Sequence, residues 1–248
     1  MAAIQQCFAV LETGYSSEYT QMKYGGYGKM VQNLCKDTGE VWDIFRVMEG
    51  EFPSQEELHK YDGFVLTGSS YDAHGNEDWI LKLCDVLRCL YDKNKKLLGI
   101  CFGHQVLCRA LGGKTGRASV GWELGLKDIT LNTDLVWKLY GLKIPSVLKV
   151  IESHQDQVSC IPPSGVVLGY SARTAIEIFA VGNSVLGIQG HPEFSEDVML
   201  DLLKSRLARG TISEELYKEG ELSFKDGQPD EEALTGLCKA FLKSREVI

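Results

Sequence analysis

Short apolar runs alternate with helix-like segments through the first half of the 248-residue chain, and this alternation constrains the fold more than any other feature. One helix-like segment precedes the fourth run, where apolar residues from Trp79 to Leu90 recur at helical spacing. Strands that are apolar on both faces are typical of a parallel sheet covered by helices on both sides. We therefore expect an α/β fold with an open, mostly parallel sheet, whose first four strands are Cys7–Glu12, Trp42–Met48, Gly63–Thr67 and Leu97–Cys101.

The second half of the chain is richer in strand patterns. Gly182 and Asn183 form a hairpin signal between two apolar runs. After His191 the pattern becomes helical over 195–209, and a charged amphipathic tail follows. We predict one catalytic domain over residues 1–210, with a helical appendage over 211–248 packed on the same domain. The strands expected in this half are Leu126–Asn132, Ser146–Glu152, Val166–Ser171, Ile176–Val181 and Val185–Gln189.

Composition narrows the classes of partner and the compartment. The chain has 26 Lys and Arg against 34 Asp and Glu, a net charge of −8, whereas nucleic-acid-binding proteins usually carry a basic surface. No apolar run approaches the ~20 residues of a membrane helix. The chain begins without the basic residues of a secretion signal, and its eight cysteines include no Cys-x-x-Cys pair. We expect a cytoplasmic (cytosolic) protein with reduced thiols that binds neither nucleic acid nor membranes.

The segment Gly99–Gln105 (Gly-Ile-Cys-Phe-Gly-His-Gln) carries the most chemical information. It places a cysteine between two glycines, after an apolar run and before a helix, which is the pattern of a nucleophile elbow. In such a turn the glycines let neighbouring backbone pass close, and N–H groups at the helix start stabilise a thiolate and an oxyanion. A buried structural cysteine at a glycine-rich strand end is the alternative, and this segment alone leaves both interpretations open.

A thiolate nucleophile needs a base or an ion-pair partner. His191 fits this role best, because Gly190 and Pro192 restrict its backbone and Glu193 lies close enough to orient its ring. A plain turn is the alternative for this segment, and the cysteine elbow in the same chain weakens it. We therefore predict a catalytic triad of Cys101, His191 and Glu193. The remaining histidines, which fit the role less well, are His59, His74, His104 and His154.

Two segments together resemble a known signature. Gly99–Gln105 and Gln189–Phe194 are similar to the motifs of class I glutamine amidotransferase domains, which are Cys-His-Glu enzymes. The resemblance spans about residues 7–209 and implies a flavodoxin-like open sheet flanked by helices. Ser153–Asp156 resembles the Ser-His-x-Asp segment of GMP-synthase-type members. The residues that the resemblance implies for oxyanion binding are Gly68, Ser69 and Phe102, and no metal or cofactor is expected.

The same resemblance implies which residues hold the substrate. Gln105, His154 and the backbone around Gly121–Gly125 would bind the α-amino and α-carboxylate groups of a glutamyl moiety. A structural role at a strand end is the alternative for His154. We expect the leaving-group side to be lined by Trp122 and by the loops Tyr24–Gly28 and Tyr71–Glu77, the first of which its glycines should make mobile.

A finer resemblance covers segments outside the predicted site. These segments are similar to the plant cytosolic γ-glutamyl peptidases, which have no synthetase partner. The resemblance implies a cysteine-nucleophile γ-glutamyl hydrolase (an omega peptidase) with a small-molecule substrate. It would cleave glutathione conjugates through a γ-glutamyl thioester, in the biosynthesis of sulfur-containing defence compounds such as glucosinolates. The segments are Lys23–Tyr27, Trp42–Val47, Tyr61–Phe64, Asp78–Cys84 and His154–Val158.

Two other functions stay open. A glutaminase subunit would use the same triad to supply ammonia to a separate synthetase, which would then be an obligatory partner. A catalytically silent binding module would keep the fold without the chemistry. The presence of Cys101, His191 and Glu193 argues against the silent module.

Overall fold

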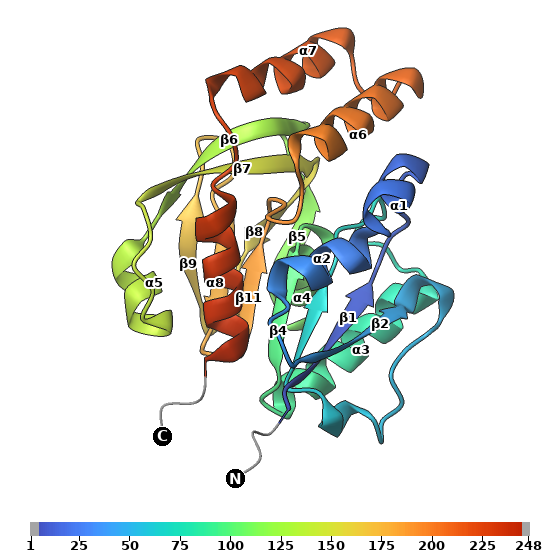
Figure 1. The fold of residues 1–248 in the computed structure, drawn as a ribbon, viewed down its shortest axis with the longest axis vertical. Coiled ribbons are helices and arrows are strands. Elements are labelled where there is room, and N and C mark those ends of the chain that lie inside the picture. The colour runs from blue at the N-terminus through green and yellow to red at the C-terminus, as the bar shows by residue number, and fades with distance from the viewer. Residues whose placement is uncertain (1–4, 245–248) are drawn as a thin grey trace.

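The computed structural model describes residues 5–244, and a nine-stranded sheet forms its centre (Figure 1). The strand order is β2-β1-β3-β4-β11-β10-β9-β6-β7, and β5 and β8 form a separate two-stranded sheet. The strands of the large sheet are β1 (Cys7–Glu12), β2 (Val41–Arg46), β3 (Gly63–Leu66), β4 (Lys96–Ile100), β6 (Glu123–Leu131), β7 (Val147–His154), β9 (Gly165–Tyr170), β10 (Ile178–Val181) and β11 (Val185–Ile188). Those of the small sheet are β5 (Lys114–Arg117) and β8 (Asp156–Cys160).

The large sheet has a parallel half and an antiparallel half. β2, β1, β3, β4 and β11 run parallel, as the apolar runs predicted. The β10–β11 hairpin reverses the direction, and β10, β9, β6 and β7 extend the sheet through antiparallel pairings. The predicted flavodoxin-like open sheet with a β-rich second half is therefore confirmed. The pairing of β5 with β8 was not predicted.

Helices cover both faces of the sheet, because successive strand residues point to opposite faces and both faces are apolar. Phe8 and Val10 of β1 point to the face covered by α2, α5 and α8 (Figure 1). Ala9 and Leu11 point to the face covered by α3 and α4. The helices are α1 (Glu18–Tyr24), α2 (Tyr27–Cys35), α3 (Asp78–Asp92), α4 (Phe102–Ala110), α5 (Thr133–Tyr140), α6 (Glu196–Ala208), α7 (Glu214–Leu222) and α8 (Glu231–Lys243). Short 3-10 helices span Val47–Glu49, Leu58–Lys60 and Ser223–Asp226.

The C-terminal helices complete two different parts of the core. α6 buries Val198 and Leu203 against the antiparallel half of the sheet. α8 buries its apolar side, including Leu237 and Phe241, in the core that lies between the sheet and α2. The tail is thus helical and closely packed, while its division from the rest of the chain at residue 210 stays a prediction.

Two further features bear on the class of protein. Within residues 5–244, no helix combines the length and the apolar character needed to cross a membrane. All eight cysteines lie within the described residues, and none of them forms a disulfide there.

The glycine-rich segment Tyr24–Gly28 does not form the loop that its composition predicted. α1 ends at Tyr24 and α2 begins at Tyr27, so that two glycines alone separate the helices. Gly25 has a φ of 78° and Gly26 a φ of 89°, values that residues with a side chain rarely adopt. These glycines therefore allow a tight junction between two helices. The error arose because a high glycine content is common to flexible loops and to helix ends.

Two glycines permit the turn between β4 and α4. A Cβ atom on Gly99 would lie 2.4 Å from the carbonyl carbon and oxygen of Gly103. A Cβ atom on Gly103 would lie 2.7 Å from the carbonyl oxygen of Leu66 in β3. Because both positions lack a side chain, the backbones of β3, β4 and α4 can approach this closely.

We expect Gly99→Ala to lower the free energy of unfolding by about 1–3 kcal/mol, because the new methyl group would overlap backbone atoms. Gly236→Ala is the matched control, since a Cβ atom at this position in α8 meets nothing within 4 Å. It should raise stability by up to about 1 kcal/mol through helix propensity. Urea unfolding measures both changes, and equal stabilities for the two variants would contradict the packing described for the turn.

Candidate active site

Cys101 occupies the turn between β4 and α4 in a backbone conformation that is rare for a residue with a side chain. Its φ is 52° and its ψ is −104°, and Asn94 is the other non-glycine residue with a positive φ in residues 5–244. The Cys101 N–H donates to the Ile188 carbonyl at 2.8 Å, and the Cys101 carbonyl accepts from the Gln105 N–H at 3.0 Å. Backbone strain of this kind is typical of nucleophile elbows.

His191 follows β11 and contacts Cys101. Its Nδ1 lies 2.9 Å from Glu193 Oε1, and the Cys101 side chain lies close enough to the ring to raise the pKa of His191. Its backbone N–H donates to the Ile151 carbonyl at 2.8 Å, and the Phe194 ring stacks on the imidazole with 3.9 Å between centroids. These contacts hold the imidazole between a carboxylate and a thiol. The structure thus brings together the three residues predicted as a triad.

The groups around His191 favour its protonated form. Burial lowers the pKa of His191, but the charges of Glu193 and Cys101 raise it by more, so that the pKa lies at about 10. An imidazolium is therefore present at neutral pH and can stabilise a thiolate. His104 differs, because burial lowers its pKa to about 3 and its ring packs on Phe179. A neutral, enclosed His104 has a packing role.

The loop after β3 passes close to the cysteine and histidine. A Cβ atom on Gly68 would lie 2.7 Å from His191 Cε1 and 3.6 Å from Cys101 Cβ, so that only glycine fits there. The Ser69 hydroxyl donates to a backbone carbonyl just after β1 at 2.7 Å, which fixes the loop. Phe102 begins α4 directly after the nucleophile. These three residues surround Cys101, and their role in oxyanion binding stays a prediction.

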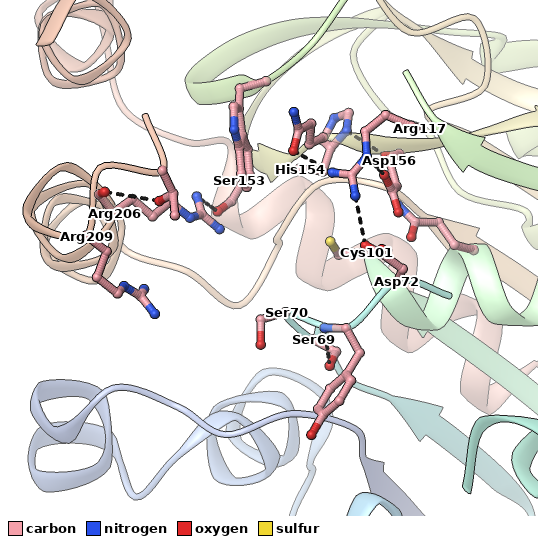
Figure 2. A pocket seen from close by; sticks show the side chains of 15 residues that line it. Ser69, Ser70, Asp72, Cys101, Arg117, Ser153, His154, Asp156, Arg206 and Arg209 are labelled. Atoms are coloured by element: carbon pink, nitrogen blue, oxygen red, sulfur yellow. Dashed lines mark hydrogen bonds and ion pairs between the residues drawn. The ribbon is translucent and has the colours of Figure 1, made fainter. Parts of the chain in front are cut away.

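Two cavities of about 260 and 330 Å³ meet at Cys101, and Figure 2 shows the first of them. The first extends toward Gln105 and Asp156, and the second toward His191 and Tyr27. Together they reach the size typical of small-molecule sites. The residues that line both cavities are Ser69, Ser70, Cys101, Ser153, Arg206 and Arg209.

The predicted substrate-binding residues all line the first cavity but are held differently. The Gln105 side-chain amide donates to the Asp156 carbonyl oxygen at 2.9 Å and to Gln189 Oε1 at 3.0 Å. His154 is 4% exposed, and its Nδ1 lies 2.9 Å from the same Asp156 carbonyl oxygen. Most of its ring is therefore buried below the surface of the cavity. Trp122 carries the Arg206 guanidinium 4.5 Å from its ring centroid.

Sequence reasoning missed two arginines at this site. Arg206 and Arg209 lie one turn apart at the end of α6 and line both cavities. Arg206 Nη1 donates to Ser153 Oγ at 2.8 Å, and the guanidinium rests on Trp122. Two arginines at helical spacing, soon after the Gly-His-Pro-Glu motif, are the signal that could have indicated them.

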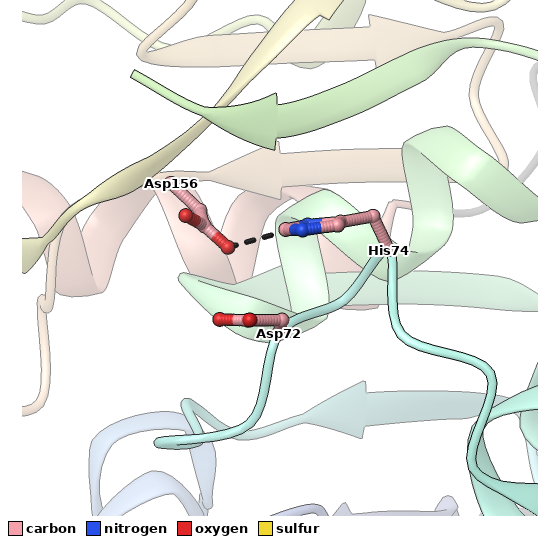
Figure 3. A group of neighbouring side chains, drawn as sticks. All are labelled: Asp72, His74 and Asp156. Atoms are coloured by element: carbon pink, nitrogen blue, oxygen red, sulfur yellow. Dashed lines mark ion pairs between the residues drawn. The ribbon is translucent and has the colours of Figure 1, made fainter. Parts of the chain in front are cut away.

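Figure 3 shows a cluster of Asp72, His74 and Asp156. The two aspartates line the first cavity. His74 Nδ1 lies 3.4 Å from Asp156 Oδ2. The Arg117 guanidinium lies 3.0 Å from Asp156 and 3.1 Å from Asp72. Carboxylates with an imidazole are donors of the kind that bind metal ions, but here a guanidinium already supplies the positive charge. The cluster is therefore an ion-pair network that joins the Asp72 loop to β5 and β8.

A second cluster of carboxylates is buried next to the backbone that precedes His191. Glu152 and Glu177 are fully buried, and His154 Nε2 lies 3.3 Å from Glu152 Oε2. These donors could also hold a metal ion. Burial, followed by neighbouring carboxylates, raises the pKa of both carboxyl groups well above its ordinary value. A Cβ atom on Gly190 would lie 2.4 Å from Glu152 Oε1, so the cluster supports the backbone that precedes His191.

We expect Glu193→Gln to lower the pKa of His191 well below 10, because the amide keeps the shape but removes the charge that favours the imidazolium. The protonated state would then be lost at a lower pH than in the unmodified chain. NMR titration of the His191 ring measures the shift. Glu196→Gln, in the first turn of α6, is the matched control and should leave the titration as it is. An unchanged pKa in Glu193→Gln would contradict the electrostatic role of Glu193.

Comparison with known proteins gives a family model and relatives that match most of the chain. The family model "Glutamine amidotransferase class-I" matches residues 25–207. Gamma-glutamyl peptidase 5 of Arabidopsis thaliana is 41% identical over 243 residues, which cover 97% of this chain and 97% of that protein. Gamma-glutamyl peptidase 4 of the same plant is 42% identical over 229 residues, or 92% of this chain and 91% of that protein. One subunit of the glutamine-hydrolyzing GMP synthase of Archaeoglobus fulgidus is 30% identical over 177 residues, covering 71% of this chain and 87% of that protein.

Solved structures share the fold. A glutamine amidotransferase from Thermotoga maritima superposes with a TM-score of 0.72 at 21% identity, covering 97% of this chain and 99% of that chain. Another from Methylobacillus flagellatus superposes with a TM-score of 0.66 at 14% identity, covering 96% and 92% of the two chains. From the family match and the relatives above 30% identity, the chain belongs to the class I glutamine amidotransferase family.

Proposed function

We propose that this protein is a γ-glutamyl hydrolase that uses Cys101 as its nucleophile. The observation that carries the proposal is the arrangement of Cys101, His191 and Glu193, in which the imidazole ring lies between a thiol and a carboxylate where two cavities meet. Similarity over nearly the whole chain to two proteins named gamma-glutamyl peptidases supports this substrate class.

In the proposed mechanism, the Cys101 thiolate attacks the γ-carbonyl carbon of the substrate. Backbone N–H groups near Gly68, Ser69 and Phe102 stabilise the resulting oxyanion. His191 donates its proton to the leaving nitrogen as the C–N bond breaks, which yields an amine and a γ-glutamyl thioester. Water then attacks the thioester, His191 accepts its proton, and glutamate leaves as the thiolate re-forms. Glu193 orients and stabilises the imidazolium in both steps.

Within this class, we propose glutathione conjugates as the substrates. Glutathione presents a γ-glutamyl amide whose leaving group is cysteinyl-glycine, and its thiol can carry a further substituent. The second cavity is lined by Tyr15, Tyr27 and Leu202, which provide apolar surface for such a substituent. A role in making sulfur-containing defence compounds would follow from this substrate class. The similarity to the peptidases also favours action without a synthetase partner. We propose the cytosol as the compartment.

A glutaminase subunit is the second candidate. The family match and the similarity to part of a glutamine-hydrolyzing GMP synthase favour it, because glutamine carries the same γ-amide. Ammonia would then be the leaving group, and a separate synthetase would be the partner. A catalytically silent binding module is the third candidate, and the assembled triad argues against it.

We expect Cys101→Ala to reduce hydrolysis of γ-glutamyl amides by at least about 10³-fold, because the covalent intermediate can no longer form. Cys160→Ala is the matched control, since it removes an exposed thiol and should leave the rate unchanged. Mass spectrometry of the amine released from glutathione measures the rates. Turnover that survives in Cys101→Ala would overturn the mechanism.

A panel of glutamine, glutathione and S-alkyl glutathiones separates the candidate functions. We expect the isolated protein to release cysteinyl-glycine products from the conjugates, because a peptidase needs no second protein. Ammonia release from glutamine that depends on an added synthetase, without cleavage of the conjugates, would favour the glutaminase subunit. A folded protein that cleaves no member of the panel would favour the binding module.

A further inference from the structure

We propose that Arg206 and Arg209 bind a carboxylate on the leaving group, so that the preferred substrates are γ-glutamyl amides whose leaving amine carries a free carboxylate. This inference rests on the proposed γ-glutamyl hydrolase function and fixes the direction in which the substrate lies. The leaving group would occupy the second cavity, which contains His191, and the glutamyl moiety would occupy the first, which contains Gln105. The first cavity also contains Trp122, so this assignment departs from the expectation that Trp122 lines the leaving-group side.

The second cavity has a positive lining. Arg206 and Arg209 contribute to it, together with His191, whose pKa of about 10 keeps it protonated. Among the described residues, no Asp or Glu lines this cavity. Its surface therefore suits an anionic group and would bind an amine poorly.

The first cavity carries charges of both signs. Asp72 and Asp156 line it together with the same two arginines, and Arg117 lies within 3.1 Å of each of the two aspartates. Figure 2 shows this group on one side of Cys101 and Arg206 on the other. A glutamyl moiety has an α-ammonium and an α-carboxylate, and such a mixed surface is suited to a zwitterion. The two cavities thus match the two ends of the substrate.

Arg206 and Arg209 lack the acidic partners that Arg117 has. In residues 5–244, neither guanidinium lies within 4.0 Å of a carboxylate. Arg206 Nη1 donates to Ser153 Oγ at 2.8 Å, and Arg209 Nε donates to a helix carbonyl at 3.2 Å. Arg206 is partly buried, and a partly buried cation without a counter-ion is costly. An anionic ligand would remove that cost.

The orientation of Arg206 also fits a carboxylate. Its guanidinium stacks 4.5 Å from the Trp122 ring centroid, and Ser153 engages one of its nitrogens. The planar group is thereby held in place where it lines the cavity. A fixed guanidinium can bind a carboxylate through two parallel hydrogen bonds. Arg209, one turn later, adds a second positive charge.

The position of His191 sets the direction of the substrate. His191 must lie beside the leaving nitrogen to protonate it. Of the two cavities, His191 lines only the second. The remainder of the leaving group is joined to that nitrogen, so it extends into the second cavity, which the arginines line as they do the first. In a γ-glutamyl tripeptide, the C-terminal carboxylate is the anion that it brings there.

The first arm of the test compares γ-glutamyl-cysteinyl-glycine with its C-terminal amide in the unmodified enzyme. We expect kcat/KM to be at least about tenfold higher for the acid, because a hydrogen bond to a charged group contributes this much. γ-Glutamyl-p-nitroanilide, whose leaving group has no carboxylate, reports on the hydrolase activity itself. If the anilide and both peptides are inert, the proposed function fails and the inference falls with it. If all are cleaved and acid and amide react equally, the inference alone is overturned.

The second arm repeats the comparison in Arg206→Gln and Arg209→Gln. We expect the acid-to-amide ratio of kcat/KM to fall toward one in these variants, mainly through KM for the acid. Lys204→Gln, an exposed position on α6 that lines neither cavity, is the control and should keep the ratio of the unmodified enzyme. Arg209 is exposed, so its variant remains informative if Arg206→Gln does not fold. An equal loss of rate for acid, amide and anilide would assign the arginines to stabilising the Cys101 thiolate and would overturn the proposal.

Discussion

The parallel pairing of β4 with β11 is the interaction on which the site depends. Ile100 lies opposite Ile188 in this pair, so both strands end at the same edge of the sheet. The Cys101 N–H then donates to the Ile188 carbonyl and continues the ladder by one bond. Main-chain hydrogen bonds thus bring the cysteine and the segment that carries His191 side by side. The site lies at the carboxyl ends of parallel strands, where open α/β sheets commonly bind ligands.

The parallel half of the sheet and the triad could be predicted because their signals are local in the sequence. A buried parallel strand is a continuous apolar run, and Leu97–Cys101 is such a run. The close approach at Gly99 and Gly103 requires glycine, and this requirement is visible as the Gly-x-Cys-x-Gly pattern. Glu193 reaches His191 from two residues away, so that this pair also needs no knowledge of the tertiary fold.

The remainder of the site depends on contacts between distant residues. β5 and β8 are short and partly polar, and they are far apart in the sequence. Their pairing places Arg117 opposite Asp156. Arg206 meets Ser153 only because α6 folds back over the antiparallel half of the sheet. In the sequence, Arg206 is an ordinary helix arginine of the kind that usually faces solvent. No local pattern separates such an arginine from one that lines a cavity.

The strained backbone at Cys101 sets the stability of the fold against the proposed chemistry at a single residue. A positive φ costs a residue with a side chain about 1–3 kcal/mol, and glycine would avoid most of this cost. Selection for stability alone would therefore favour glycine at position 101, and only a need for the thiol favours cysteine. Under the proposed mechanism, a duplicated copy released from its substrate would accumulate the glycine and become more heat-resistant as it became inactive. In descendants of this chain, gain of thermal stability at the elbow would thus mark the loss of the reaction.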